Sequence, residues 1–259
     1  MLLLNLPIDQ LQLFLFVLVR VSAILFSLPF LESRSVPVMI KVSLAVAVAM
    51  MITPRLAVPV PNLFGDPFSL GLAIMAEAAI GWTIGLSVQL LFAGVQLAGQ
   101  LAGFQMGFAI ANVVDPASSS QIPILAQFLN LFALMLFFSI NAHFYFIKAM
   151  MEAFDLIAPM SAQIDGRLTQ FIMKMAGNAF MIAIKISAPV MVALMLAKVA
   201  LGLTARTVPQ MHIFIVSMPL QILMGLIFLS FSLPYISAFL QTAFRELGQN
   251  LTLMIRLFV

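Results

Sequence analysis

Charged residues leave long gaps along the chain, and apolar side chains fill these gaps. No Asp, Glu, Lys or Arg lies between Glu77 and Asp115, between Asp115 and Lys148, or between Arg206 and Arg245. Each gap exceeds the roughly 20 apolar residues that a helix needs to cross a bilayer. A spanning β-barrel would instead show segments of about ten residues with alternating polarity. The pattern therefore predicts an all-α membrane protein.

Prolines, glycines and the few charges divide the chain into expected elements. Helices are expected over about 7–29, 38–52, 123–147, 168–203 and 214–240, with an amphipathic tail from residue 241 and a loop over 53–67. The stretch 68–114 has no proline, and as one helix it would be about 70 Å long. Because the hydrocarbon core is about 30 Å thick, we expect one of two arrangements. The stretch either folds back as a hairpin, with a break within 94–107, or stands partly outside the bilayer in a protein environment.

Composition strengthens this prediction and excludes several functions. The chain is 63% hydrophobic and 8% charged, whereas soluble domains carry about 25% charged residues, so the apolar surplus must face lipid or apolar partners. No Lys/Arg cluster is present, so nucleic-acid binding is not expected. There is no Cys, the two His lie in different segments, and no zinc, Walker or nucleophile motif occurs. We therefore expect no catalytic residue, metal or cofactor.

Small residues recur at every fourth position in the stretch 68–114. Such spacing places them on one helix face and permits close approach between membrane helices. This face is compatible with ordinary tight packing, with an oligomer interface or with a wet lumen. The stripe consists of Gly81 and Gly85, in line with Glu77, followed by Gly99, Gly103 and Gly107.

Four charges interrupt the apolar runs: Arg20, Glu77, Lys185 and Lys198. Each would cost about 2.5–3.5 kcal/mol at a helix centre, so such residues normally pair or face a cavity. Glu77 shares the glycine face, so we expect it to meet a basic partner on another helix, and we assign Arg20, Glu77 and Lys185 to helix packing and assembly. The alternative is a stand-alone transporter or channel, in which these three residues bind a substrate or coupling ion.

The segment 103–116 alternates glycine with bulky apolar side chains. Apolar rings can close a pore by dewetting, and Met is flexible enough to seal around varied shapes, although a re-entrant turn explains the pattern equally well. The candidate gate residues are Met106, Phe108, Ile110, Val113, Val114, Asp115 and Pro116.

These residues also carry a resemblance to a known family. The run from Gln105 to Pro116, continued by Phe137 and Asn141, is one part of it, and a second part is the run 201–211, continued by Phe214, Pro219, Leu220 and Gly225. Together and in order they resemble the FliR family, an export-gate membrane protein of bacterial flagellar type III secretion. Ala142 and His212 stand where that family usually has glycine and asparagine.

The resemblance implies an architecture of membrane-associated helical hairpins that is unusual for a polytopic protein. Residues 1–175 would form a FliP-like helical region that contains a plug loop at about 107–120. Residues 176–259 would form a FliQ-like helical hairpin with the amphipathic tail. The turn of this hairpin, with Arg206, Pro209 and Gln210, would face an FlhB-like partner.

The resemblance also implies a function and a location. The chain would be a pore subunit that assembles with FliP-like and FliQ-like subunits and works with FlhB-like and FlhA-like components. The assembly would form and close the channel for unfolded flagellar proteins. It would lie in the bacterial inner membrane, in contact with lipid, within the flagellar basal body, and would protrude partly toward the periplasm.

Overall fold

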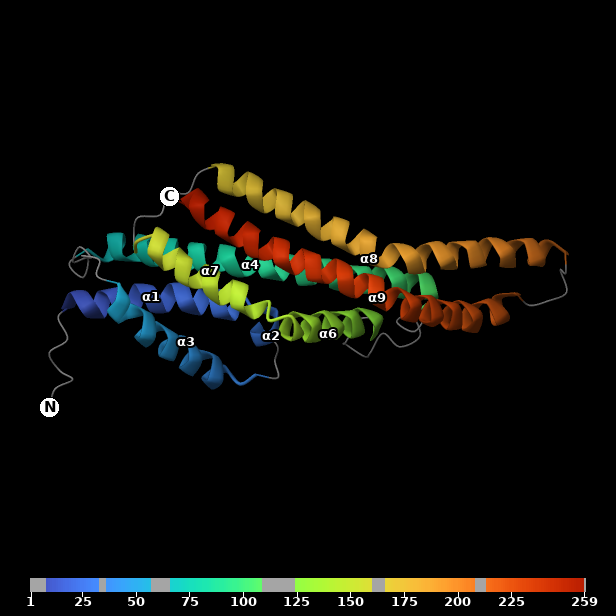
Figure 1. The fold of residues 1–259 in the computed structure, drawn as a ribbon, viewed down its shortest axis with the longest axis horizontal. Coiled ribbons are helices and arrows are strands. Elements are labelled where there is room, and N and C mark those ends of the chain that lie inside the picture. Colours follow the sequence, from blue (N-terminus) through green and yellow to red (C-terminus); the bar gives the residue numbers. More distant parts are fainter. Residues whose placement is uncertain are drawn as a thin grey trace. The chain divides into compact units, whose positions relative to one another are not determined.

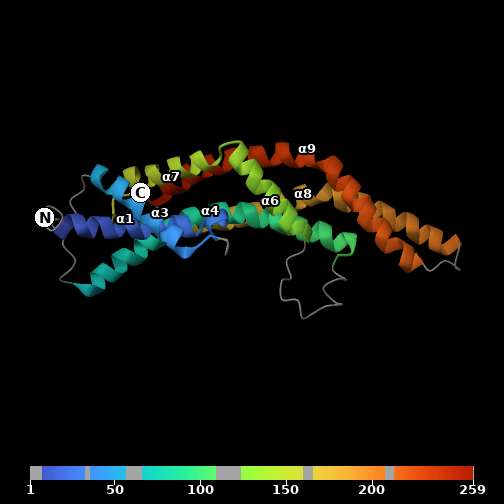
Figure 2. The same ribbon diagram turned by 90° about the horizontal axis from the view of Figure 1, so that it is seen from below.

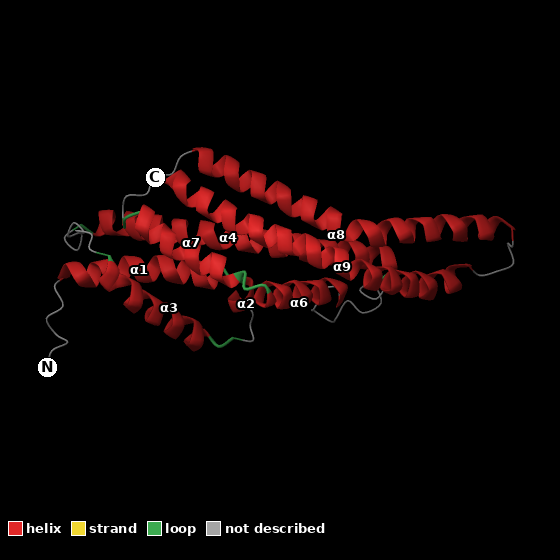
Figure 3. Ribbon diagram, viewed as in Figure 1, coloured by secondary structure: helices red, strands yellow, loops and turns green. Residues whose placement is uncertain are grey.

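The computed structural model describes residues 8–32, 36–56, 66–108, 124–159, 166–207 and 213–258, and its regular elements in these ranges are all helical (Figures 1 and 3). The α-helices are α1 (Ile8–Phe26), α2 (Pro29–Glu32), α3 (Val38–Ile52), α4 (Pro67–Met106), α6 (Ile124–Ser139), α7 (His143–Leu156), α8 (Gly166–Thr207) and α9 (Ile213–Ile255), with 3-10 turns at Thr53–Arg55 and Arg256–Phe258. The predicted all-α fold is confirmed.

The helices are long and apolar enough for a protein embedded in a membrane. In the described part of the chain, α4, α8, α9 and α3 with its 3-10 extension could each cross a bilayer, and α6 with α7 could supply a fifth, broken span. The chain is thus a polytopic membrane protein, as predicted. Prolines inside α8 (Pro189) and α9 (Pro219 and Pro234) do not end these helices, because neighbouring groups in membrane helices can satisfy the freed carbonyls.

Two arrangements were expected for the stretch 68–114, and one of them was a hairpin with a break within 94–107. The structure has a single 40-residue helix, α4, which runs to Met106. The expectation of a hairpin break before Met106 was wrong, because the glycines there serve packing. A methyl group added at Gly94 would lie 2.6 Å from the carbonyl oxygen of Ala179, and one added at Gly99 would collide with the backbone of Ala126. At 1.5 Å per residue α4 is about 60 Å long, twice the hydrocarbon core.

Asp66 fixes the start of α4. Its carboxylate accepts a hydrogen bond from the backbone N–H of Phe68 (3.2 Å) and another from the Ser69 hydroxyl, which satisfies donors that a helix start leaves free. The Ser69 hydrogen bond holds the pKa of Asp66 below its ordinary value of 3.8. The carboxylate therefore stays charged at the positive end of the helix dipole.

Other expected boundaries also differ from the structure. The helix expected over 7–29 ends at Phe26 and is followed by the separate helix α2, and the helix expected over 168–203 continues to Thr207. The helix expected over 123–147 ends at Ser139, and α7 begins at His143. Between them Asn141 has φ 57°, in the left-handed region that asparagine tolerates better than most residues. The tail expected from residue 241 continues α9 without a break as far as Ile255.

The chain forms two compact units. Unit 1 comprises Met1–Leu90, Asn141–Met175 and Arg245–Val259, and unit 2 comprises Leu91–Ile140 and Ala176–Phe244. The long helices α4, α8 and α9 contribute to both units, so the units do not follow chain order. The division at residue 175 that the family resemblance implies stays a prediction.

The core of unit 1 lies where α1 runs along α4 (Figures 1 and 2). It buries Phe16, Val17, Val21 and Ile24 of α1 and Ile80, Ile84 and Val88 of α4. Helix α3 buries only Ala45, Ala49 and Ile52 and exposes most of its other apolar side chains. In unit 2 three rings pack together: the centroid of Phe137 lies 5.8 Å from that of Phe92 and 5.3 Å from that of Phe244.

Candidate functional site

A buried ion pair joins α1 to α4 in unit 1. Arg20 Nε lies 2.5 Å from Glu77 Oε2, and both residues are completely buried. The expected basic partner of Glu77 is therefore confirmed, and it comes from the same chain. Since each charge neutralises the other away from water, the pair belongs to the packing of the fold.

Arg20 also binds the end of α7. Its Nη1 donates to the carbonyl oxygens of Ala153 and Ile157, each at 2.9 Å, and its guanidinium carbon lies 4.7 Å from the centroid of the Phe154 ring. The last carbonyls of a helix carry the negative end of its dipole, so a cation is favourable there. Ala153 O also accepts from the backbone N–H of Ile157 at 3.2 Å, so Ile157 O depends more on Arg20 than Ala153 O does. One side chain thus holds α1, α4 and α7 together.

The glycine stripe makes this arrangement possible. A methyl group added at Gly81 would lie 2.5 Å from the Arg20 carbonyl oxygen and 2.7 Å from Ala23 Cβ, and one added at Gly85 would collide with Ser27. The stripe that begins at Glu77 therefore packs directly on the backbone of α1. In unit 1 the spacing serves tight packing between helices.

Helix α4 ends in unit 2 on a glycine in a left-handed conformation. Gly107 has φ 90°; its N–H donates to Phe104 O (3.2 Å), and the next N–H, of Phe108, donates to Gly103 O (3.1 Å). These two bonds form a Schellman motif, which favours glycine because a side chain at this φ is strained. The helix therefore stops where the predicted plug loop begins.

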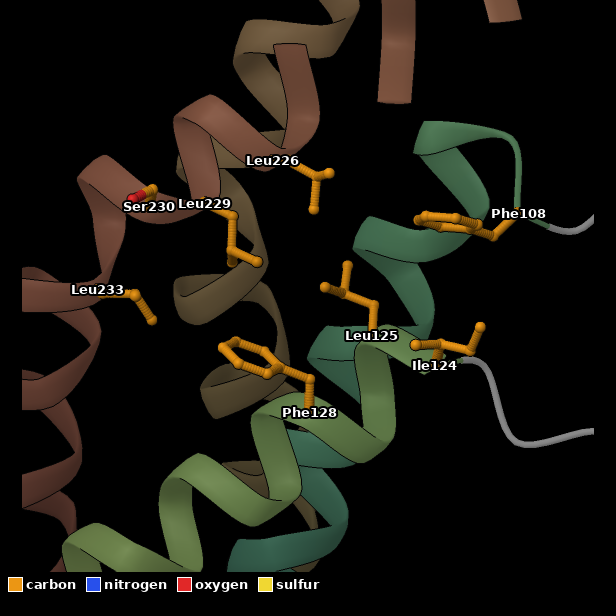
Figure 4. Close-up of a pocket in the computed structure, with 8 residues that line it drawn as sticks. All are labelled: Phe108, Ile124, Leu125, Phe128, Leu226, Leu229, Ser230 and Leu233. Carbon is orange, nitrogen blue, oxygen red and sulfur yellow. The ribbon is translucent and has the colours of Figure 1, made fainter. Parts of the chain in front are cut away.

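An apolar cavity of about 340 Å³ lies beside this helix end, also in unit 2 (Figure 4). Phe108 from the end of α4 and Ile124 from the start of α6 both line it, so residues 109–123 connect two points on the same cavity. Of the eight lining residues only one is polar: Phe108, Ile124, Leu125, Phe128, Leu226, Leu229, Ser230 and Leu233.

Of the other predicted gate residues, the structure describes only Met106. Met106 is completely buried and packs on Gly225 of α9. The remaining ones, Ile110, Val113, Val114, Asp115 and Pro116, lie outside the described residues. So do Pro209 and Gln210 of the predicted hairpin turn, whereas Arg206 lies exposed in the last turn of α8.

The lysines within α8 have separate surroundings in unit 2. Lys185 is exposed, and its Nζ lies 5.5 Å from the centroid of the Phe239 ring. Lys198 donates a hydrogen bond to Gln105 Oε1 in the last turn of α4. Sequence reasoning missed this contact because the two residues are 93 positions apart. The sequence analysis also missed the α7 carbonyls that Arg20 binds, because backbone acceptors leave no mark in the residue types of a sequence.

Comparison with known proteins places the chain in a family. Residues 11–247 match the family described as bacterial export proteins, family 1. The flagellar biosynthetic protein FliR of Bacillus subtilis (strain 168) is 37% identical over 228 residues, which are 87% of each chain. FliR of Escherichia coli (strain K12) is 32% identical over 240 residues, 93% of this chain and 91% of that protein. The chain therefore belongs to the FliR family of bacterial export proteins.

Proposed function

We propose that the chain is a non-enzymatic pore subunit of the flagellar type III protein export gate in the bacterial inner membrane. In this proposal it assembles with FliP-like and FliQ-like subunits and adjoins FlhB-like and FlhA-like components. The assembly forms and closes the channel through which unfolded flagellar proteins leave the cell. Membership of the FliR family, whose members named above are flagellar biosynthetic proteins, supports this role.

The observation that carries the proposal is the position of the apolar cavity in unit 2. Both chain neighbours of the segment 109–123 line it, and that segment contains most of the predicted gate residues. A narrow passage with apolar walls blocks ions because water leaves it readily. The gate must exclude ions when it is closed and let a polypeptide pass when it is open. Apolar side chains are suited to both states.

The exposed apolar surface supports assembly with other membrane subunits and with lipid. Helix α3 exposes Met39 by 83% and Val38 by 70%, and α8 exposes Met195 and Leu196 by more than 60% each. Exposed apolar area of this extent marks contact with partners or membrane. The buried Arg20–Glu77 pair weakens the alternative of a stand-alone transporter, since these two charges already satisfy each other.

Shortening the predicted plug loop tests the gate assignment. Deleting residues 110–117 keeps Gly107, Phe108 and Ile124, and it should make the assembled gate permeable to small ions. A deletion of residues 58–61, within the loop predicted over 53–67, serves as the control and should leave ion permeability unchanged. Unchanged permeability of the first variant, in gates shown to be assembled, would contradict the plug assignment.

Native mass spectrometry tests the assembly. The tagged chain would be co-expressed with its FliP-like and FliQ-like neighbours and purified in mild detergent. The proposal expects a large hetero-oligomer that contains the chain. A monomer or homodimer that persists in gentler detergents would favour the stand-alone transporter instead.

A further inference from the structure

We propose that the C-terminal end of α4 is a fixed anchor for the gate, and that its contact with α9 stays closed while the channel conducts. Met106, Gly225 and Lys198 are then positioning residues. This inference rests on the proposed pore function. It separates the parts of unit 2 that stay in place during export from those that are free to rearrange.

The first anchoring element is the backbone at Gly107. The two hydrogen bonds of the Schellman motif fix the path of the chain as it leaves α4. The positive φ of Gly107 sets the direction in which Phe108 enters the cavity. This element depends on α4 alone.

The second element is the Met106 side chain, which packs into a notch of α9, the space that Gly225 leaves free. A methyl group added at Gly225 would lie 2.5 Å from Met106 Cγ, 2.6 Å from its Cε and 2.8 Å from its Sδ. The Met106 side chain therefore occupies the space that only a glycine leaves free. Met106 is completely buried, so leaving the notch would expose apolar surface and open a cavity at once.

The third element comes from α8. Lys198 donates to Gln105, which precedes Met106, so its charge lies at the last turn of α4, where the helix dipole is negative. Three consecutive residues at the end of α4 are thus held in three different ways: Gln105 by α8, Met106 by α9 and Gly107 by bonds to the last turn of α4 itself. Moving this end away from its neighbours requires the contacts of both Gln105 and Met106 to break.

A disulfide between α4 and α9 tests whether they stay together. The chain has no cysteine, so the M106C/G225C variant introduces the only pair. The Sγ of a cysteine at 106 takes the place of Met106 Cγ, about 2.5 Å from the new Cβ at 225. Because Met106 Cβ is bonded to Cγ, it lies within about 4 Å of the new Cβ at 225, which is close enough for a disulfide.

The readout compares the oxidised and reduced forms of the same variant in assembled gates. We expect the disulfide to form, and we expect the oxidised gate to export flagellar protein at the rate of the reduced gate, within about twofold. Export that stops on oxidation and returns on reduction would overturn the inference, as would failure of the disulfide to form in the assembled gate. The single variants M106C and G225C control for oxidation effects elsewhere.

A second pair keeps the test decisive if the double cysteine variant does not assemble or export. Gly225→Ala should displace Met106 and raise the ion permeability of the gate several-fold, whereas Gly202→Ala, on α8 with open space around it, should leave the permeability unchanged. No leak in Gly225→Ala, or an equal leak in Gly202→Ala, would count against the anchor. The loop deletion separates the two proposals: a leak there with a failed anchor test leaves the pore function standing.

Discussion

The Arg20–Glu77 ion pair can be removed by replacing either residue, and we expect the two replacements to differ in their effect on stability. Replacing Glu77 by Gln keeps an acceptor for Arg20 and leaves its bonds to the α7 carbonyls in place. Replacing Arg20 by Met leaves the buried carboxylate without its counter-ion and also removes the donor to Ile157 O. We therefore expect Arg20→Met to lower the free energy of unfolding more than Glu77→Gln.

The expected losses in the free energy of unfolding differ enough to distinguish Arg20→Met from the double Met variant. Breaking a buried ion pair costs about 3–5 kcal/mol, and a buried carbonyl that loses its donor costs about 1–3 kcal/mol more. Arg20→Met should thus cost about 4–8 kcal/mol, a large part of the 5–15 kcal/mol that typically holds a protein folded. The double variant Arg20→Met/Glu77→Met has no buried charge, so only the carbonyl cost of about 1–3 kcal/mol remains.

Detergent-induced unfolding of the purified protein, followed by circular dichroism, measures these differences. Lys185→Met is the matched control, because this exposed lysine loses only a cation–π contact of about 0.5–1 kcal/mol. The exchange Arg20→Glu/Glu77→Arg should not restore stability, since a carboxylate would then face the α7 carbonyls. Stability of the exchange variant equal to the original, or Arg20→Met no weaker than Glu77→Gln, would refute the threefold role of Arg20.

Three further predictions concern single side chains. Gly81→Ala should cost about 1–3 kcal/mol by forcing α1 from α4, while Gly71→Ala, with open space around it, should be neutral or stabilising in the same unfolding assay. Asp66→Asn should lower the unfolding temperature at neutral pH. Because the pKa of Asp66 is lowered in the folded protein, the charged carboxylate stabilises the fold until it is protonated. The difference in unfolding temperature between the variant and the parent should therefore vanish as the pH falls below 3.8. Phe137→Ala should cost about 3–5 kcal/mol and Phe138→Ala, at a half-exposed ring, under about 1 kcal/mol; equal losses would contradict the ring cluster.

The helices could largely be predicted from the sequence, because apolar runs and prolines mark them. The bounds of α3 agree with the prediction, since Pro37 and Pro54 bracket it. The continuity of α4 could not be foreseen in the same way. A glycine that breaks a helix and a glycine that receives a neighbouring backbone look alike in sequence, and only the contact of Gly99 with Ala126 decides between them.

The sequence predicted which helix face of the candidate site is buried and that Glu77 has a basic partner, but it did not predict the individual contacts. The four-residue spacing identified the face of Glu77 and the charge of its partner, because periodicity fixes which side of a helix a residue takes. It did not identify Arg20 as that partner, since pairing across 57 residues depends on how the helices cross. The helix end at Gly107 was not predicted as such, because the sequence analysis placed Gly107 in the small-residue stripe. The space that Gly225 leaves for Met106 depends on the packing of two helices and could not be predicted either.

The glycine stripe and the ion pair together fix the register of α1 on α4. Gly81 and Gly85 stand one turn apart and both lie against α1, so after a slip of one turn one of the two close contacts still meets a glycine. Such a slip moves Arg20 by about 6 Å along α4, which breaks its bond to Glu77 and its bonds to α7. The buried pair therefore acts against a register that the small residues exclude only in part, a role for which buried polar groups are known. On this argument the double Met variant should stay folded and lose its single register, so cysteines placed to cross-link α1 to α4 should form two products where the parent forms one.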